Sequence, residues 1–512
     1  MPRARLAIVV IATLAIAGPR AAGLRVSAAG PAGRLAVACG DLSSLALPGG
    51  TVVSARLVPA GPLPGGGRGP VLVVPAHCRL AATLRPAAGS SIRFEAWLPA
   101  DGWNGKMVVV GNGAYGGSVP LPALAAGLRA GYAAVASDTG HSGSGAAFAL
   151  HSPDQLRDFI DRAVHESALH GKAVTAKAYG RAPTRAYFNG CSTGGRQGLT
   201  AAQRYPKDFD GIVAGSPGNY TTRQVFGQVW VAQAMKADAA STVPAGKLPV
   251  LHAAVMAACD AADGVADGVL EDPTTCSFDP AALQCTEGDG PACLTAPQVA
   301  AVRKTYAGAR HSRSGDLLFP GFERGSELGW ARWVGDQPPD YATEFFRYVA
   351  FKDPAWHFTS LDFDRDVTRV DQLDVPIDAT EADLGTFVAR SGKLLIYAGW
   401  NDPGIAPRNA VAYYTRVVET VGAARANEAI RLFMVPGMAH CGGGEGTSSF
   451  DMLQALDDWV ERGTAPARVL AAREQDGQVV RTRPLCPYPQ VATYVGAGNV
   501  DDAANFVCRS AR

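Results

Sequence analysis

The sequence predicts an α/β fold with a mainly parallel sheet and helices on both of its faces. Short apolar runs alternate with helix-compatible segments toward both ends of the chain, as strands joined by helical crossovers do. The runs at residues 107–110 and 394–397 are apolar without interruption, which is typical of strands buried on both faces. The alternation stops between about residues 218 and 379, where aromatic residues and four cysteines gather, so we expect a second domain to be inserted there.

The expected elements follow the chain in order. The predicted strands are residues 106–111, 132–137, 185–189, 211–214, 393–398 and 430–435, and the predicted helices are residues 155–176, 194–205, 407–421 and 450–462. We expect residues 23–218 to form the first part of the core, with an N-terminal β extension at residues 24–90. Residues 219–379 are the expected inserted domain, and residues 380–512 are the second part of the core.

The composition excludes disorder and gives no sign of a polyanionic partner. The 512 residues include 47 Lys and Arg against 46 Asp and Glu, with 47% hydrophobic and 18% charged residues. Disordered chains combine low hydrophobicity with high net charge, and this chain has neither. Because a balanced charge creates no basic field for nucleic acid or anionic membranes, we expect a small molecule as the partner, with no nucleic acid and no membrane.

Residues 1–22 are arranged like a secretory signal peptide. Arg3 and Arg5 precede an apolar run at residues 6–17, and small residues follow at Ala21 and Ala22, which is the layout of a cleaved signal. The apolar run is shorter than the roughly 20 residues that a membrane span needs, and we find no later run that is long enough. We therefore expect residues 1–22 to be removed and the protein to be secreted or periplasmic.

The ten cysteines agree with an oxidising compartment. An even number in an exported chain is typical of a set of disulfides, and the sequence lacks the ligand spacing of a zinc site. Short separations favour three pairs, Cys259 with Cys276, Cys285 with Cys293 and Cys486 with Cys508. The remaining four are Cys39, Cys78, Cys191 and Cys441.

The segment Gly190-Cys-Ser-Thr-Gly194 matches the G-x-S-x-G pattern of a nucleophile elbow. A predicted strand precedes it and a predicted helix follows, which is the strand–turn–helix setting that an elbow requires. Glycines permit the tight turn, and the turn lifts the serine hydroxyl clear of the sheet. A glycine-rich turn that carries an ordinary serine is the alternative.

A serine nucleophile needs a base and an acid, which follow it in α/β-hydrolases in the order acid, then histidine. Asp402 and His440 each come shortly after a predicted strand, where catalytic loops emerge. A turn aspartate before proline is the alternative for Asp402. The other downstream histidines lie in the expected insertion, where we expect His252, His311 and His357 to be surface residues or part of the cap that the insertion forms. We predict Ser192, Asp402 and His440 as the catalytic triad.

Two cysteines give an independent argument for this triad. Cys191 precedes Ser192, and Cys441 follows His440. If the serine and histidine side chains are hydrogen bonded at about 3 Å, their neighbours come within the ~4.4–6.8 Å Cα separation that a disulfide needs. Such a bond would hold the base against the nucleophile, and two free buried thiols are the alternative.

Several motifs resemble those of the tannase and feruloyl esterase family. They are Gly190-Cys-Ser-Thr-Gly-Gly-Arg-Gln-Gly-Leu199, Gly399-Trp-Asn-Asp-Pro403 and His440-Cys441, and the likeness runs from about residue 39 to the C-terminus. The resemblance implies an α/β-hydrolase core, a large lid formed by the inserted domain, and esters of aromatic acids as substrates. It also implies the disulfides Cys39–Cys78 and Cys191–Cys441.

The glycine-rich loop at residues 111–117 lies where members of this family carry such a run. We expect it to form half of an oxyanion hole, a pair of backbone donors for the negative oxygen of a tetrahedral intermediate. By position, the N–H of Gly113 is the donor from this loop, and the N–H of Thr193 is the other. A loop that only turns the chain is the alternative.

Residues 259–272 gather aspartates and glycines within the expected lid. Their spacing differs from that of an EF-hand, so a solvated acidic turn is the alternative. The family resemblance implies a structural Ca²⁺ here, far from the chemistry. The matching ligands are the carboxylates of Asp260, Asp263 and Asp267 and the carbonyls of Val265 and Val269.

Together these features predict a secreted serine carboxylesterase that hydrolyses esters of aromatic acids, of the feruloyl, galloyl or terephthaloyl type, through an acyl-enzyme. Two alternatives stay open. One is an α/β-hydrolase with other acyl substrates, and the other is a non-catalytic calcium-dependent binding protein.

Overall fold

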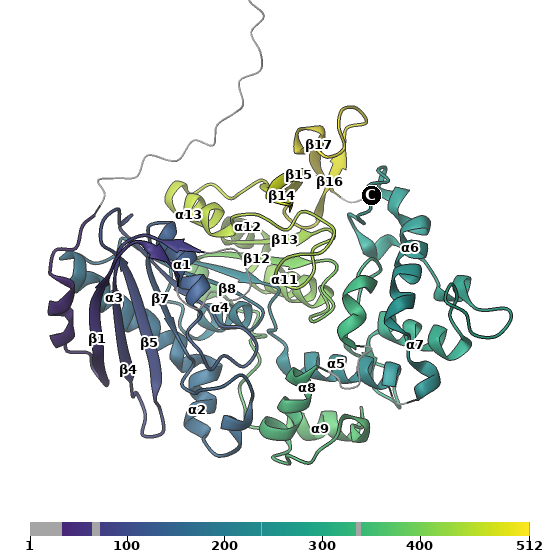
Figure 1. Cartoon of the computed structure of the whole chain (residues 1–512), viewed down its shortest axis with the longest axis horizontal. Helices are drawn as coiled ribbons and strands as arrows, with labels where there is room; N and C mark the ends of the chain where they lie inside the picture. The colour runs from purple at the N-terminus through teal and green to yellow at the C-terminus, as the bar shows by residue number, and fades with distance from the viewer. Residues whose placement is uncertain (1–32, 64–71, 237, 334–338, 511–512) are drawn as a thin grey trace, which may run out of the picture.

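A nine-stranded sheet lies at the centre of the computed structural model, which describes residues 33–63, 72–236, 238–333 and 339–510 (Figure 1). The strand order is β1-β4-β5-β7-β6-β8-β9-β12-β13. Strands from β7 to β13 pair in parallel, whereas β1, β4, β5 and β7 pair antiparallel. This is the predicted α/β-hydrolase fold. The strands are β1 (Gly50–Val58), β4 (His77–Leu84), β5 (Ile92–Pro99), β6 (Lys106–Val110), β7 (Ala133–Ser137), β8 (Arg185–Cys191), β9 (Gly211–Gly215), β12 (Lys393–Gly399) and β13 (Ile430–Val435).

Helices cover both faces of this sheet. One face carries α3 (Ala163–Tyr179), α4 (Thr193–Arg204) and α11 (Arg408–Val421), and the other carries α1 (Leu121–Arg129) and α13 (Met452–Arg462).

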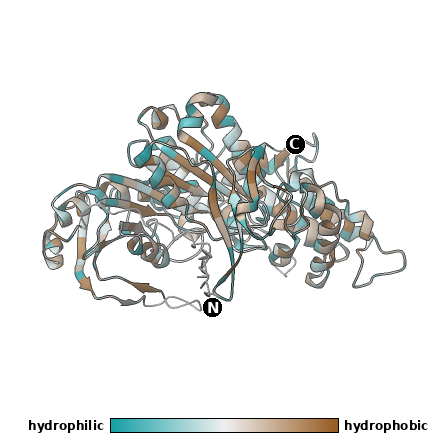
Figure 2. Cartoon of the chain, turned by 90° about the horizontal axis from the view of Figure 1, so that it is seen from above, coloured by the Kyte–Doolittle hydropathy of each residue, from teal (hydrophilic) through white to brown (hydrophobic). Residues whose placement is uncertain are grey.

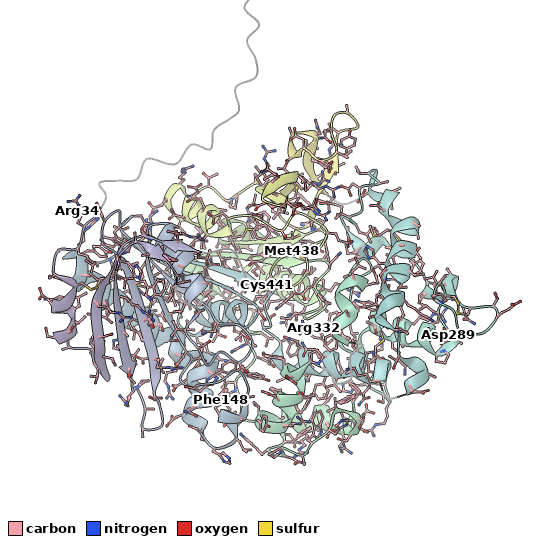
Figure 3. All side chains as sticks on the ribbon, viewed as in Figure 1. Arg34, Phe148, Asp289, Arg332, Met438 and Cys441 are labelled. Atoms are coloured by element: carbon pink, nitrogen blue, oxygen red, sulfur yellow. A yellow bond between two sulfur atoms is a disulfide. The ribbon has the colours of Figure 1, made fainter. Side chains whose placement is uncertain are left out.

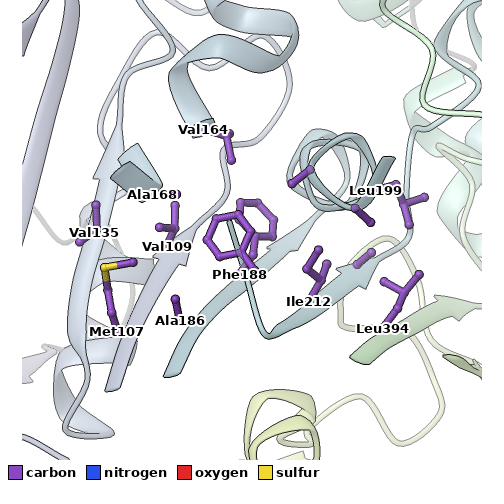
Figure 4. Close-up of a cluster of buried hydrophobic side chains, with 14 of the residues drawn as sticks. Met107, Val109, Val135, Val164, Ala168, Ala186, Phe188, Leu199, Ile212 and Leu394 are labelled. Carbon is purple, nitrogen blue, oxygen red and sulfur yellow. The ribbon is translucent and has the colours of Figure 1, made fainter. Parts of the chain in front are cut away.

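Successive residues of one strand enter opposite hydrophobic clusters. Met107 and Leu394 pack under the first group of helices (Figure 4), and their neighbours Val108 and Leu395 pack under the second. Because strand side chains alternate between faces, a sheet covered on both sides requires the uninterrupted apolar runs seen in the sequence.

The predicted core strands and helices are all present, with small shifts at their ends. The helix expected at residues 155–176 is interrupted, since α2 (Pro153–Arg157) and α3 flank a π-helical turn at Asp158–Arg162. The prediction misses two two-stranded sheets near the C-terminus, whose strands mix buried and exposed residues and carry no long apolar run. They are β14 (Val469–Gln475) with β15 (Gln478–Leu485), and β16 (Gln490–Tyr494) with β17 (Phe506–Ser510).

The chain between β9 and β12 is mostly helical and lies beside the sheet (Figure 1). We call residues 219–379 the lid, and these two boundaries stay predictions. Two hydrophobic clusters bury most of its aromatic side chains, including Trp330, Trp333, Phe345, Phe346, Trp356 and Phe358. Its main helices are α5 (Thr221–Lys236), α6 (Leu248–Cys259), α7 (Ala296–Ala307), α8 (Asp340–Glu344) and α9 (Arg365–Asp371).

One stretch of the described chain, Ala239–Asp263, is long and apolar enough by length and composition to cross a membrane. The expectation that no such run follows the signal was therefore wrong on that criterion. A helix buried in the core of a globular protein has the same length and composition. Here α6 buries Leu248, Leu251 and Val255 in a lid cluster. Figure 2 shows that hydrophobic residues are also concentrated in the central strands of the sheet.

Every cysteine is paired, in the five predicted combinations Cys39–Cys78, Cys191–Cys441, Cys259–Cys276, Cys285–Cys293 and Cys486–Cys508. Five disulfides indicate a protein that folds in an oxidising compartment. The predicted signal peptide at residues 1–22 lies outside the described residues.

Candidate active site

Ser192 occupies the sharp turn between β8 and α4. Its backbone has φ +64° and ψ −121°, a conformation that costs a residue with a side chain about 1–3 kcal/mol. The turn leaves no room at its flanks, since a Cβ added at Gly190 would lie 2.8 Å from Gly194 and one at Gly195 would lie 2.3 Å from the carbonyl oxygen of Gly215. The Ser192 N–H donates to that same Gly215 oxygen at 2.9 Å. The sequence motif thus adopts the predicted strand–turn–helix geometry.

Asp402 and His440 meet at the carboxyl ends of neighbouring strands β12 and β13. The Nδ1 atom of His440 lies 2.7 Å from Oδ2 of Asp402. The other carboxylate oxygen accepts the N–H groups of Gly404 at 2.7 Å and Ile405 at 3.0 Å. Asp402 is 1% exposed. A buried carboxylate on Nδ1 holds the proton there, which leaves Nε2 with the lone pair that a general base uses.

A disulfide joins the neighbours of Ser192 and His440. Cys191 and Cys441 have a Cα separation of 6.0 Å and stand 250 residues apart in the chain. Figure 3 shows Cys441 in the central part of the molecule, where the core meets the lid. The bond therefore keeps the segment of His440 beside the nucleophile turn, as predicted from the order of the four residues.

The glycine-rich loop after β6 packs against this turn. Thr193 donates its hydroxyl to the carbonyl oxygen of Ala114 at 2.6 Å. A Cβ added at Gly194 would lie 3.2 Å from the carbonyl oxygen of Asn112. Gly113 stands between these two contact points, and a Cβ there would meet nothing within 4 Å. Gly113 and Thr193 thus lie in two segments that pack against each other, and their pairing as oxyanion donors stays a prediction.

Two lid residues reach this site that the sequence reasoning missed. The Tyr341 hydroxyl is hydrogen bonded to the side chains of Thr193 and Thr221, and burial raises its pKa. Arg332 approaches the predicted triad, because a Cβ added at Gly404 would lie 3.6 Å from its Nη1 and 3.8 Å from the ring of His440. Neither residue belongs to a local motif, so only the folded lid reveals them.

The acidic loop of the lid contains the predicted calcium ligands. Two of their carboxylates are hydrogen bonded or ion-paired to other groups of the protein. The Asp260 carboxylate accepts the N–H groups of Asp267, Gly268 and Val269, and Asp267 is bonded to Arg483 of β15. Within the described chain, no three His, Cys, Asp or Glu side chains are grouped as a metal site.

Four of the predicted ligands line one cavity of about 20 Å³, which has room for a single water-sized particle. They are Asp263, Val265, Asp267 and Val269. The donors thus fit Ca²⁺ by type, and Arg483 already contacts the Asp267 carboxylate that would bind the ion.

The sheet order and the strained serine turn define an α/β-hydrolase. Residues 78–509 match the family described as Tannase and feruloyl esterase, and the chain belongs to this family. An uncharacterized esterase of Xanthomonas campestris is 39% identical over 92% of this chain and 91% of its own length. A probable feruloyl esterase B-1 of Aspergillus terreus is 34% identical over 84% of this chain and 86% of its own. The crystal structure of feruloyl esterase B from Aspergillus oryzae superposes with a TM-score of 0.85 at 30% identity, covering 91% of this chain and 98% of that one. The chain is therefore a carboxylic ester hydrolase, which confirms the predicted enzyme class.

Proposed function

We propose that the protein is a secreted serine esterase that hydrolyses esters of aromatic acids, of the feruloyl, galloyl or terephthaloyl type, through an acyl-enzyme on Ser192. The observation that carries the proposal is the Asp402–His440 pair held beside Ser192 by the Cys191–Cys441 disulfide. A binding protein has no need of this arrangement, which argues against the non-catalytic alternative.

The reaction begins when the Ser192 hydroxyl oxygen attacks the ester carbonyl carbon. His440 takes the hydroxyl proton on Nε2, and Asp402 stabilises the resulting imidazolium through Nδ1. The tetrahedral intermediate collapses, the alkoxide leaves with the proton from His440, and the acyl group stays on Ser192. A water molecule, deprotonated by the same imidazole, then attacks the acyl carbon and releases the acid.

The negative oxygen of each tetrahedral intermediate needs donors that are already in place. The N–H of Thr193 opens α4, where the helix end favours negative charge. The N–H of Gly113 is the proposed partner on the neighbouring loop. Removing one such donor typically costs 10²–10³-fold in kcat.

The aromatic acyl group is proposed from the surroundings of Thr193 and from the names of the relatives. The rings of Tyr115 and Tyr341 stack with their centroids 4.7 Å apart. The Tyr341 hydroxyl is hydrogen bonded to the side chain of Thr193. Flat aromatic groups bind well against such rings by stacking and apolar burial. Tyr115 is 2% exposed and belongs to the same hydrophobic cluster as Phe346 and Trp356, whereas Tyr341 packs against this cluster and is only partly buried, so Tyr341 is the ring proposed to meet the acyl group.

The test is hydrolysis of methyl ferulate, methyl gallate and a terephthalate monoester beside an aliphatic ester and a peptide. We expect the aromatic esters to be hydrolysed with the higher kcat/KM. Replacing Ser192 by Ala should lower kcat on each of them by up to roughly a million-fold. Preference for the aliphatic ester or the peptide would reject the substrate class, and near-normal hydrolysis by the Ser192→Ala variant would reject the mechanism.

Export and calcium belong to the same proposal. The five disulfides support maturation outside the cytoplasm, and N-terminal sequencing of the mature protein would test cleavage near residue 22. The oxygen donors around Asp263 support a structural Ca²⁺ in the lid. This ion has no role in the chemical steps.

A further inference from the structure

A buried histidine of the lid bridges two glutamates from different parts of the fold. His252 on α6 places Nδ1 2.9 Å from Oε2 of Glu327, which also belongs to the lid. Its Nε2 lies 3.2 Å from Oε2 of Glu445, in the loop that follows β13. The side chains of His252, Glu327 and Glu445 are 11%, 0% and 30% exposed. One imidazole thus links the lid to the segment that carries His440.

Glu327 is the fixed end of this bridge. It accepts the hydroxyl of Tyr306 at 2.8 Å and the N–H of Gly325 at 2.9 and 3.0 Å. These contacts are fully buried within the lid. The orientation of Glu327 is therefore set without the help of the core.

Glu445, the second partner of His252, belongs to the loop that carries His440 and is hydrogen bonded within it. Its N–H donates to the carbonyl oxygen of Gly437 at 2.9 Å, and its carbonyl oxygen accepts from Arg473 at 2.6 Å. The N–H of Ala439 donates to Gly443 at 3.2 Å within the same loop. His440 lies inside this loop, so the positions of Glu445 and His440 are linked through its backbone hydrogen bonds.

The same part of the lid also holds the loop of the catalytic acid. Asn401 donates its side-chain amide to the carbonyl oxygen of Gly325 at 2.6 Å. Trp333 donates its indole N–H to the carbonyl oxygen of Pro403 at 2.8 Å. These contacts lie on either side of Asp402. The lid therefore contacts both loops, the one that carries Asp402 and the one that carries His440.

We propose that His252 is a positioning residue. It links the lid to the His440 loop through Glu445 and so keeps the base aligned with Ser192. The proposal rests on the function proposed above, in which His440 is the base. His252 does not touch the substrate or the reacting atoms in this scheme. It acts through the placement of His440, where an error of about 1 Å is enough to cost roughly 10²-fold in rate.

The bridge depends on the charge of the imidazole. Burial lowers the pKa of His252, but the hydrogen bonds to Glu327 and Glu445 outweigh burial and raise the pKa to about 9. The other titratable or charged groups around the bridge are the Tyr306 hydroxyl on Glu327, Arg324 near Tyr306, and Arg473 on the Glu445 backbone. Because the pKa is raised, the stability that the charged bridge contributes is fully present below the ordinary histidine value of 6.5 and is lost as the pH rises through about 9, where the imidazolium loses its proton.

The test compares His252→Gln and Glu445→Gln with His311→Gln, a matched control. His311 pairs with Asp364 at 3.4 Å inside the lid and has no part in the bridge. At pH 7.5 we expect kcat/KM for a small aromatic ester to fall about 10- to 100-fold in either bridge variant, mainly through kcat, and to stay unchanged in the control. The double variant should be no worse than the worse single variant, since both break one link.

The pH profile separates positioning from simple stability. Wild-type kcat/KM should decline above pH 9, and His252→Gln should lack this decline and stay low throughout. Wild-type activity in both bridge variants, or an unchanged alkaline decline in His252→Gln, would overturn the proposal. Should His252→Gln fail to fold, the partly exposed Glu445→Gln supplies the same comparison.

A failure of the proposed function gives a different pattern. If Ser192→Ala keeps its activity, the catalytic scheme is wrong whatever the bridge does. The bridge then remains testable by hydrogen exchange of residues 436–446, which should accelerate in His252→Gln and not in His311→Gln. Unchanged exchange in both variants would contradict the link between lid and loop.

Discussion

Asp402 shows how much of the catalytic geometry is set by single atoms. One oxygen receives Nδ1 of His440, and the other is occupied by two backbone N–H groups from Gly404 and Ile405. The side chain therefore cannot exchange the roles of its two oxygens without losing two hydrogen bonds. Together with the strained φ of Ser192, this fixes two of the three proposed catalytic groups before substrate arrives.

Replacing Asp402 by Asn should lower kcat about 10⁴-fold with little change in KM. The two backbone donors keep the amide oxygen on their side, so the amide NH₂ faces Nδ1 and forces the proton of His440 onto Nε2. A protonated Nε2 cannot accept from Ser192. Steady-state kinetics on one aromatic ester checks this, with Asp383→Asn as the control because Asp383 also accepts a nearby backbone N–H. Equal activity of the two variants would contradict the assigned role.

At the scale of elements, the site depends on loops from β8, β12 and β13 meeting at one edge of the sheet. Parallel pairing of β8 with β9, β9 with β12, and β12 with β13 brings their carboxyl ends together. The Cys191–Cys441 disulfide then ties the first of these loops to the last across 250 residues. In the loop-entropy account, closure of so long a loop contributes about 5 kcal/mol, an upper value because other disulfides already restrict the unfolded chain.

Replacing both Cys191 and Cys441 by Ser should lower kcat and the free energy of unfolding together. The matched control replaces Cys285 and Cys293, whose disulfide closes only 8 residues and should contribute about 2–3 kcal/mol without affecting kcat. Thermal unfolding and ester hydrolysis measure the two effects. The account fails at this scale if the first double variant hydrolyses esters as fast as the control.

At the scale of the whole molecule, the lid contacts the C-terminal strands as well as the catalytic loops. Arg481 and Arg483 of β15 reach Asp267 in the acidic loop of the lid. Burial raises the pKa of Asp267 and of Asp263, and the nearby Asp260 carboxylate raises both further because the negative charges repel each other. A divalent cation would compete with the arginines for this charge.

Added Ca²⁺ should therefore stabilise the protein against thermal unfolding. With an affinity typical of extracellular sites, 10 mM Ca²⁺ should add on the order of 1–3 kcal/mol. Asp263→Asn should abolish the response, and Asp279→Asn, a lid aspartate paired with Arg303 outside the loop, should retain it. If the midpoint of thermal unfolding responds neither to Ca²⁺ nor to a chelator, the loop is a salt-bridged turn that binds no calcium.

The sequence predicted those features that local patterns encode. Core strands such as β6 and β12 were predictable because burial on both faces demands unbroken apolar runs, and the turn at Ser192 because its glycines are sterically required. The C-terminal strands, which mix buried and exposed residues, carry no such pattern. His252 was expected to be a surface or cap residue, and its bridge to Glu445 depends on tertiary contacts. The bond of Asp267 with Arg483, 216 residues later, was equally beyond local reasoning.

The most direct test is to locate the reactive serine itself. A fluorophosphonate probe should modify the folded protein once, and peptide mapping by mass spectrometry should place the adduct on Ser192. Ser192→Ala should remain unlabelled, while His311→Gln should label like the wild type. Two results would contradict the account. One is an adduct on another residue. The other is that excess probe leaves Ser192 unmodified although the protein hydrolyses esters fully.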